Sequence, residues 1–431
     1  MTARTTPTTD QSRPALHRRL GVRDAVVIGL GSMVGAGVFS AFTPAAAAAG
    51  SGLLVGLVVA AVVAWCNATA SAQLAAQYPT SGGTYVYGRE RLGEWWGFVA
   101  GWGFVVGKTA SCAAMALTFA SYAVPGSTWA QRLVGVAAVV LLAGANCLGV
   151  TRTAGLTRLL VAASLLALAV VVAAILGGGA RASGLGDVHG GAYGVLQSAG
   201  LLFFAFAGYA RIATLGEEVR DPERTIPRAI PFALGIAVLI YAAVGISCLL
   251  AAGPEALAAS TAPVATAVKA AGEAWAVPFV RVGATVASLG ALLALIAGIG
   301  RTSLAMARNG DLPRALAAVE PRHRVPARAE LAVAVVVSVL VLTTDLRGAI
   351  GFSSFGVLTY YAIANTAAFT QTADRRRWPR ALNVLGAAGC AVLAFTLPVS
   401  AVVAGLAVLA IGVAGRLLFA HSEPVARTGH S

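Results

Sequence analysis

The chain has 431 residues, of which 58% are hydrophobic and 11% are charged, and its mean hydropathy is +0.80. Soluble domains are about 45–50% apolar and about 25% charged, so a water-soluble fold and a disordered chain are both excluded. An apolar stretch of about 20 residues crosses a bilayer as a helix, and this chain supplies about twelve such stretches. The composition predicts an all-α polytopic membrane protein.

The apolar stretches define the expected transmembrane helices in chain order. They run over about 25–47, 52–76, 96–123, 128–150, 157–178, 194–215, 229–252, 275–306, 329–343, 348–371, 381–397 and 399–420. Short polar loops separate them, so we expect one transmembrane domain over residues 23–420. Residues 1–22 and 421–431 are polar, and we expect both to be cytoplasmic tails.

The net charge of +14 reflects where the basic residues lie along the chain. Arginines gather before the first span, in residues 301–328 and in residues 375–380. If about twelve spans alternate, these clusters share one side of the membrane, as the positive-inside rule requires of cytoplasmic loops. The pattern predicts cytoplasmic termini and contact with membrane lipid, and it argues against a nucleic-acid partner. The five cysteines lie within apolar runs without metal-ligand spacing, so no metal site is expected.

Glycines interrupt two of the expected spans. The first contains Gly29, Gly31, Gly35 and Gly37, and the sixth contains Gly208 after a run of phenylalanines. Unwound backbone within a membrane is tolerated only where it lines a cavity or is buried in protein, and paired breaks point to a transporter site. Breaks five spans apart suggest two inverted five-helix repeats, at about 25–178 and 194–371, with extra helices at about 381–420. Close helix packing through small residues is the alternative explanation.

Charged residues are nearly absent from the middle of the spans. All 17 Asp and Glu lie in tails, loops or span ends, which disfavours a carboxylate proton relay or a buried catalytic or metal site. Lys108 lies about 18 Å along the third span, where a lysine is a functional-site hypothesis. It either exchanges a proton during transport or bonds to backbone carbonyls as a structural amine. Arg211, near the end of the sixth span, pairs with Glu217 or Glu218 or reaches the membrane surface.

A broken helix has the chemistry to bind an amino acid zwitterion. The N-terminus of a half-helix offers unpaired N–H groups and partial positive charge to a carboxylate, and a C-terminus offers carbonyls to an ammonium. Such a site needs no acidic side chain. The phenylalanines Phe203, Phe204 and Phe206 then form an apolar wall or gate, unless they serve only in packing.

Four stretches carry a family resemblance, and together they extend over most of the chain. They are residues 29–39, 78–89, 203–222 and 306–313. In this order and spacing the chain resembles the amino acid–polyamine–organocation permeases. The resemblance implies a twelve-helix transporter of the five-plus-five inverted-repeat fold in the plasma (inner) membrane. It implies alternating access, driven by an ion or by exchange, and no enzymatic activity or resident cofactor.

The resemblance also assigns substrate contacts. The assigned positions are Ser32, Met33, Gly35, Ala36, Gly37, Phe203, Phe204, Ala205, Phe206 and Gly208. By analogy, the amides at 35–37 receive the carboxylate and carbonyls around residues 203, 205 and 206 hold the amine. Phe204 falls where the family often has a gating aromatic.

Two departures from the family bear on coupling and substrate. Ser164 stands where proton-coupled relatives often carry a lysine, so either Ser164 helps to bind Na⁺ or Lys108 supplies the missing cation. The coupling ion is therefore H⁺ or Na⁺. Ala210 stands where carriers of cationic substrates often have an acid, and with Lys108 nearby this favours a neutral amino acid, with an acidic one as the alternative.

Two other classes compete with the amino acid permease. A channel, or a carrier of organic amines or metal ions, would favour acids, histidines or carbonyl-rich loops at the midplane. A membrane enzyme would need a buried catalytic constellation, and the sequence offers no catalytic residues. The sequence indicates neither the oligomeric state nor the particular substrate.

Overall fold

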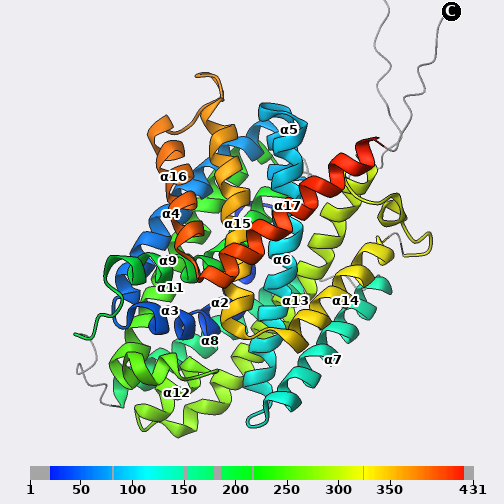
Figure 1. Cartoon of the computed structure of the whole chain (residues 1–431). Coiled ribbons are helices and arrows are strands. Elements are labelled where there is room, and N and C mark those ends of the chain that lie inside the picture. The colour runs from blue at the N-terminus through cyan, green and yellow to red at the C-terminus, as the bar shows by residue number, and fades with distance from the viewer. Residues whose placement is uncertain are drawn as a thin grey trace, which may run out of the picture.

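The computed structural model describes residues 20–79, 82–149, 154–178, 186–215, 218–323 and 325–421. The predicted tails lie almost entirely outside these ranges. Within the described residues every named element is a helix (Figure 1). This is the outcome expected in lipid, where a helix pairs its own backbone polar groups.

The helices fall into two series along the chain. The first series is α1 (Val22–Met33), α2 (Ala36–Ser40), α3 (Phe42–Ala49), α4 (Leu53–Gln77), α5 (Thr84–Leu92), α6 (Glu94–Ala123), α7 (Thr128–Cys147) and α8 (Ala154–Gly177). The second is α9 (Gly191–Phe206), η2 (Ala207–Tyr209), α10 (Ala210–Ala213), α11 (Pro222–Ala258), α12 (Pro263–Ala270), η3 (Ala274–Ala276), α13 (Val277–Arg308), η4 (Arg314–Ala317), α14 (Ala327–Thr343), α15 (Leu346–Phe369), α16 (Arg380–Thr396) and α17 (Val399–His421). Each of the twelve predicted spans coincides with a helix or a run of helices.

Nine helical segments of the described chain are long and apolar enough to cross a membrane. Of the remaining predicted spans, α14 and α16 have 17 residues each, close to the lower limit of about 17 for a crossing helix. Helix α15 has 24 residues, but its serines, tyrosines and asparagine make it more polar. The fold class predicted from composition, an all-α polytopic membrane protein, is confirmed.

Local sequence explains several helix ends. Proline follows Asp221 at the start of α11, where its missing N–H is not needed. The Asp345 side chain caps α15 by accepting a hydrogen bond from the Gly348 N–H at 2.7 Å. Gly253, with φ of 72°, bends the far end of α11. These signals place the turns at the ends of the bundle.

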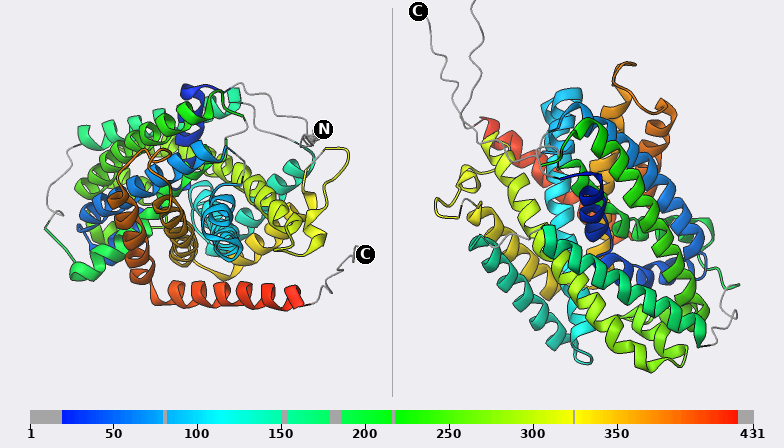
Figure 2. Two further views of the ribbon diagram at one scale, coloured as in Figure 1. Left: turned by 90° about the horizontal axis from the view of Figure 1, so that it is seen from above. Right: turned by 180° about the vertical axis from the view of Figure 1, so that it is seen from behind.

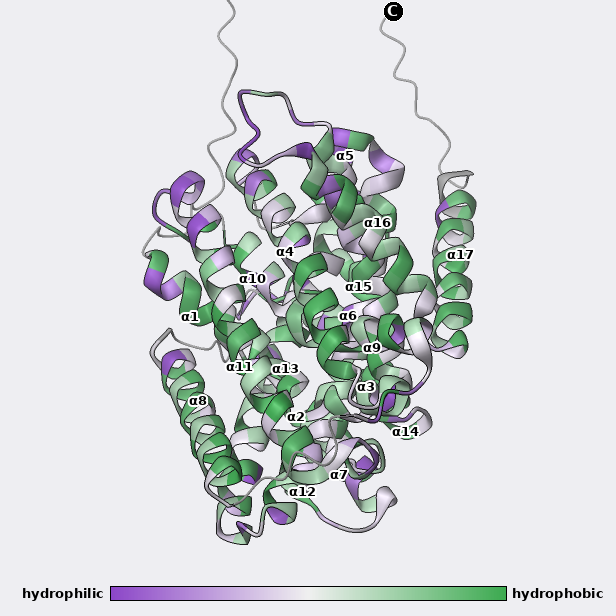
Figure 3. Cartoon of the chain, turned by 90° about the vertical axis from the view of Figure 1, so that its left-hand side faces the viewer, coloured by the Kyte–Doolittle hydropathy of each residue, from purple (hydrophilic) through white to green (hydrophobic). Residues whose placement is uncertain are grey.

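The bundle has two chemically different ends, which we call the basic end and the opposite end. The basic end carries α5 and the arginine-containing loops that follow α10, α13 and α15, and the opposite end carries α12. Figure 3 shows hydrophobic residues along the lengths of α8 and α17, with hydrophilic residues gathered near α5. Helix α6 packs most extensively against α15 and α13, and α17 lies along one edge of the bundle (Figure 2).

Candidate substrate site

The first span is interrupted as predicted. Helix α1 ends at Met33, Val34 and Gly35 have non-helical backbone angles, and α2 begins at Ala36. The Gly35 N–H bonds to the Met33 carbonyl at 2.7 Å, in a tight turn outside the helical pattern. The first N–H groups of a helix have no partner within that helix, so this turn leaves an N-terminus inside the bundle.

The sixth span differs from the prediction in form. It does not unwind: α9 ends at Phe206, residues Ala207–Tyr209 tighten into a 3₁₀ turn, and α10 continues from Ala210. A 3₁₀ turn changes the hydrogen-bond register, so carbonyls next to it become available to other donors. The alanine, glycine and tyrosine of this turn keep near-helical angles, which is why the span stays continuous.

The backbones of the first and sixth spans are in direct contact at two glycines. A Cβ on Gly37 would lie 2.6 Å from the Cα of Ala205, and a Cβ on Gly208 would lie 2.2 Å from the carbonyl oxygen of Ser32. Only glycine permits approaches this close. Both explanations offered for the glycines therefore apply: Gly37 and Gly208 allow close packing, and Gly35 lies within the break itself.

Tyr241 of α11 joins the two interrupted spans. Its hydroxyl lies 2.7 Å from the Met33 carbonyl oxygen and 2.8 Å from the Ala205 carbonyl oxygen. One hydroxyl carries one proton, so two acceptors share a single donor. Tyr241 was not predicted from the sequence. Its partners Met33 and Ala205 lie 208 and 36 residues away along the chain, and a tyrosine within a long apolar span gives no local pattern that reveals them.

Lys108 binds the 3₁₀ turn from the opposite side. Its Nζ donates to the Ala207 carbonyl at 3.1 Å, and the residue is 6% exposed. In the described part of the chain it forms no ion pair with an acidic side chain. This contact is the one expected of a structural amine, and a role in proton exchange stays a prediction.

The predicted phenylalanine wall is divided between two neighbours. The ring of Phe203 packs edge-on against Tyr361 of α15 at 5.8 Å, whereas Phe206 packs against Tyr241 at 4.9 Å. Phe204 is 7% exposed. Phe203 and Phe206 therefore brace the turn from two sides, and Phe204 is left as the candidate gate.

The remaining predicted positions flank the first break. Ser32 donates its hydroxyl to Ile28 within α1, and Met33 is buried beside it. Ser164 is buried on α8 and donates to Leu160 at 2.8 Å, so its hydroxyl is turned toward its own helix. Arg211 lies 3.9 Å from Glu218, one of its two expected partners; Glu217 is outside the described residues.

The opposite end of the site is closed by Tyr122 of α6. Its hydroxyl donates to the Phe39 carbonyl at 2.7 Å and accepts from the Val264 N–H at 3.3 Å. The rings of Phe39 and Tyr122 also meet edge-on at 5.9 Å, and all three residues are buried. The first break, α6 and α12 are thus locked together.

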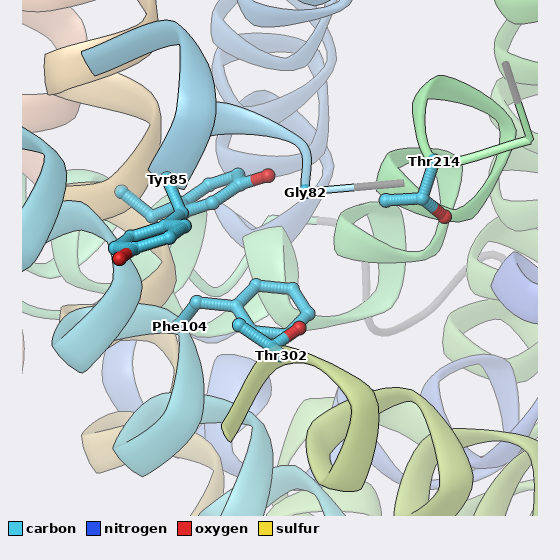
Figure 4. Close-up of a pocket in the computed structure, with 6 residues that line it drawn as sticks. Gly82, Tyr85, Phe104, Thr214 and Thr302 are labelled. Atoms are coloured by element: carbon cyan, nitrogen blue, oxygen red, sulfur yellow. The ribbon is translucent and has the colours of Figure 1, made fainter. Parts of the chain in front are cut away.

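A small pocket with a cavity volume of about 10 Å³, room for about one water molecule, lies toward the basic end. Figure 4 shows Tyr85 and Phe104 on one side of it and Thr214 on the other. The lining residues are Gly82, Tyr85, Phe104, Thr214, Thr302 and Tyr360. Phe104 lies one helical turn before Lys108 on α6, so the pocket approaches the substrate site from the basic end.

Charged side chains join α5, α6 and α17 beside this pocket. Asp311, which follows α13, lies 3.0 Å from Arg89 and 3.1 Å from Arg416, and its side chain is 3% exposed. Glu94 also pairs with both arginines, at 3.0 and 3.6 Å. Tyr85 donates to Asp311 at 2.7 Å, and burial together with this hydrogen bond raises the pKa of Tyr85 to about 12.

A broken first span in contact with a sixth span that tightens into a 3₁₀ turn, within a polytopic bundle of apolar helices, is typical of a membrane transporter. The family comparison agrees: the amino acid permease family model matches residues 20–418. The chain belongs to the amino acid permease family and is a multi-pass membrane transporter.

Individual relatives span a range of similarity. An uncharacterized transporter of Mycobacterium tuberculosis (strain H37Rv) is 61% identical over 401 residues, covering 93% of this chain and 90% of that protein. A branched-chain amino acid permease of Bacillus subtilis is 25% identical, covering 86% of this chain and 84% of the relative. Human cationic amino acid transporter 4 is 30% identical, covering 82% of this chain and 59% of the relative.

Proposed function

We propose that this permease carries neutral amino acids by alternating access as a secondary active transporter. The observation that best supports this proposal is the backbone contact between the first and sixth spans at Gly37 and Gly208. An N-terminus at Ala36 meets carbonyls at Ala205 and Ala207 that already accept side-chain hydrogen bonds. This arrangement supplies donors for a carboxylate and acceptors for an ammonium within one small region.

In this proposal the amides of Ala36 and Gly37 receive the substrate carboxylate, and the Gly35 amide joins them by leaving the Met33 carbonyl, to which it bonds in this structure. The helix dipole of the run that α2 begins favours negative charge there. The carbonyl of Ala205 holds the ammonium, and Tyr241 then donates its single proton to Met33. The Tyr241 hydroxyl therefore changes partner when substrate binds.

Charge and size favour a neutral substrate. Lys108 reaches the Ala207 carbonyl beside the region proposed for the amine, so a second positive charge on a substrate side chain is repelled. Ala205 and Ala291 lie against the glycines of the first break, which leaves an apolar wall of small residues. The relatives include both a branched-chain amino acid permease and a cationic amino acid transporter, so a cationic amino acid is the rival substrate.

Lys108 is the proposed coupling group, through loss and gain of a proton at its Nζ. Losing that proton removes the charge from the contact with Ala207 and frees η2 to move. Binding of Na⁺ near Ser164 is the alternative, and exchange of one amino acid for another needs neither. Replacing Lys108 with methionine should make uptake independent of pH between 6 and 9, and an unchanged pH profile would return Lys108 to a structural role.

We further propose that the protein lies in the plasma membrane with the basic end and both termini in the cytoplasm. The pocket bounded by Tyr85, Phe104 and Thr214 is then the route to the cytoplasm, and Tyr122 closes the external side. In this orientation the Tyr122 contact closes the outer side, and the inner side holds only a water-sized pocket.

Uptake and counterflow in proteoliposomes test the proposal. Liposomes loaded with an unlabelled neutral amino acid should accumulate the labelled form, and lysine or arginine should not compete. Competition by lysine would establish the cationic substrate instead. Accumulation of an organic amine or a metal ion without any amino acid would support the carrier alternatives, and catalytic turnover of a substrate would support an enzyme.

A further inference from the structure

Behind the substrate site, Asn67, Tyr209, Tyr361 and Asn365 form a buried cluster of polar side chains. They belong to α4, η2 and α15, and all four are 0% exposed. The Asn365 amide donates to the Asn67 side-chain oxygen at 2.6 Å and to the Tyr361 carbonyl at 2.9 Å. The Cys390 thiol of α16 lies 3.3 Å from the same Asn67 oxygen.

Four polar atoms of this cluster have no hydrogen-bond partner among the described residues. They are Asn67 Nδ2, Asn365 Oδ1 and the hydroxyl oxygens of Tyr209 and Tyr361. The two tyrosine rings lie 5.1 Å apart, and the Tyr209 hydroxyl faces both Tyr361 and Asn67. Buried polar groups almost always have partners, so four unpartnered atoms gathered in one place indicate a missing common ligand.

We propose that this cluster is an internal hydration site that binds a few water molecules and solvates the turn of the sixth span. A buried water typically makes about three hydrogen bonds to such groups, so about two waters satisfy four atoms and their neighbours. The proposal concerns the hinge of the transporter and does not depend on which amino acid is carried.

The mixture of donors and acceptors selects water over an ion. Asn67 Nδ2 is only a donor, so it repels a cation, and Asn365 Oδ1 is only an acceptor, so it repels an anion. The hydroxyls of Tyr209 and Tyr361 can act in either sense. Water alone among small ligands satisfies all four, and none of the four residues carries a charge to balance an ion.

The location of the cluster connects it to both the substrate site and the pocket. Tyr209 ends η2, and Gly208 before it packs on the backbone of Ser32. Tyr360, which lines the pocket, packs edge-on against Tyr361 at 5.1 Å. The cluster therefore lies between η2 and the wall of the pocket, and water bound there can replace lost partners when η2 moves.

Tyrosine-to-phenylalanine substitutions separate a wet cluster from a dry one. In a wet cluster, Tyr209→Phe and Tyr361→Phe each lose hydrogen bonds to water and lower the Tm by about 2 °C. In a dry cluster the same changes remove an unpartnered hydroxyl, so the Tm stays constant or rises, which would overturn the proposal. Tyr193→Phe, at a tyrosine that is 52% exposed, is the control and should not change the Tm.

Radiolytic labelling in water enriched in oxygen-18 detects the waters directly. Hydroxyl radicals formed from bound water oxidise adjacent side chains, so Tyr209 and Tyr361 should be labelled in a millisecond pulse. Tyr122 and Tyr241 are equally buried, but their hydroxyls bond to protein, and they should stay unlabelled. Equal labelling of all four tyrosines, or none, would overturn the proposal.

A cation titration completes the test. The Tm of the purified protein should be the same in sodium, potassium and choline chloride at equal ionic strength. A Tm increase specific to sodium or potassium that Asn365→Leu abolishes would identify an ion site and contradict the hydration site. An increase that persists in this variant would place the ion outside the cluster, which agrees with water as the ligand of the cluster.

Discussion

At the opposite end, one neutral hydroxyl holds three elements together, because Tyr122 bonds to both Phe39 and Val264, and the Tyr122 carbonyl also accepts from Arg281 at 2.9 Å. At the basic end, closure depends on charge, because Asp311 is held by Arg89 and Arg416. The first contact is dry and buried, and it switches by exchanging one or two hydrogen bonds. The second draws α17 into the network, and water can reach it through the adjacent pocket.

The two ends are therefore expected to open in different ways, because one is held by hydrogen bonds and the other by ion pairs. A neutral hydrogen bond in a dry environment contributes about 1 kcal/mol, so a modest binding energy shifts that end. Separating a largely buried carboxylate such as Asp311 from its arginines costs more, because it leaves an unpaired charge. We therefore expect the basic end to open by sliding around a persistent network, and the opposite end to open by breaking its contact. The backbone contact between the first and sixth spans, at Gly37 and Gly208, takes part in both opening motions.

The largest expected effect falls on that shared contact. Gly37→Leu should reduce transport about 100-fold. Its side chain would overlap the Ala205 backbone and push apart the first and sixth spans, which together form the proposed substrate site. Initial uptake rate in proteoliposomes measures it. Gly235→Leu in α11, where a Cβ meets no described atom within 4 Å, is the matched control and should stay near wild type. Equal losses would remove the special role of the first break.

Next in size is the loss of the buried acid at the basic end. Asp311→Asn leaves Arg89 and Arg416 facing a neutral group and should lower the free energy of unfolding by about 3 kcal/mol. Thermal or denaturant unfolding of the purified protein measures the change. Asp374→Asn, whose side chain is 72% exposed, is the control and should leave the free energy of unfolding unchanged. Matching values would mean that the network contributes nothing.

A smaller effect is expected at the opposite end. Tyr122→Phe removes the hydroxyl but keeps the ring, so it should favour opening by about 1 kcal/mol, or about fivefold. The rate at which an impermeant maleimide labels a cysteine introduced at Val264 reports the opening. Tyr193→Phe serves as the control at the same end. A labelling rate that stays constant would show that Tyr122 does not lock this end.

The smallest effect concerns pH at the basic end. Burial and Asp311 raise the pKa of Tyr85 to about 12, above the value near 10 of an unfolded tyrosine. The folded state then retains a proton that the unfolded state loses, so stability is full below pH 9 and falls as the pH rises. Between pH 9 and 10.5 the loss should be about 0.8 kcal/mol. Tyr85→Phe should lack this part of the pH dependence, and an identical slope would contradict the assignment.

The sequence was most informative where a property repeats along the chain. Apolar runs predicted where the helices lie, and nine of the resulting segments in the described chain are long and apolar enough to cross a membrane; glycine spacing predicted the interruption at Gly35. It was less informative for the sixth span, because one glycine does not distinguish an unwound segment from a 3₁₀ turn. Pairings between distant residues, such as Tyr241 with Met33 or Asp311 with Arg416, leave no local pattern and emerge only from the packed helices.

Competition by modified amino acids tests whether the first and sixth spans bind the two charges of a zwitterion, because each modification removes one of those charges. Bound at Ala36 and Ala205, a neutral amino acid should displace the labelled substrate, whereas its methyl ester and its N-acetyl derivative should both fail to do so. An ester or acetyl derivative that competes as well as the parent amino acid would contradict recognition by the two interrupted spans.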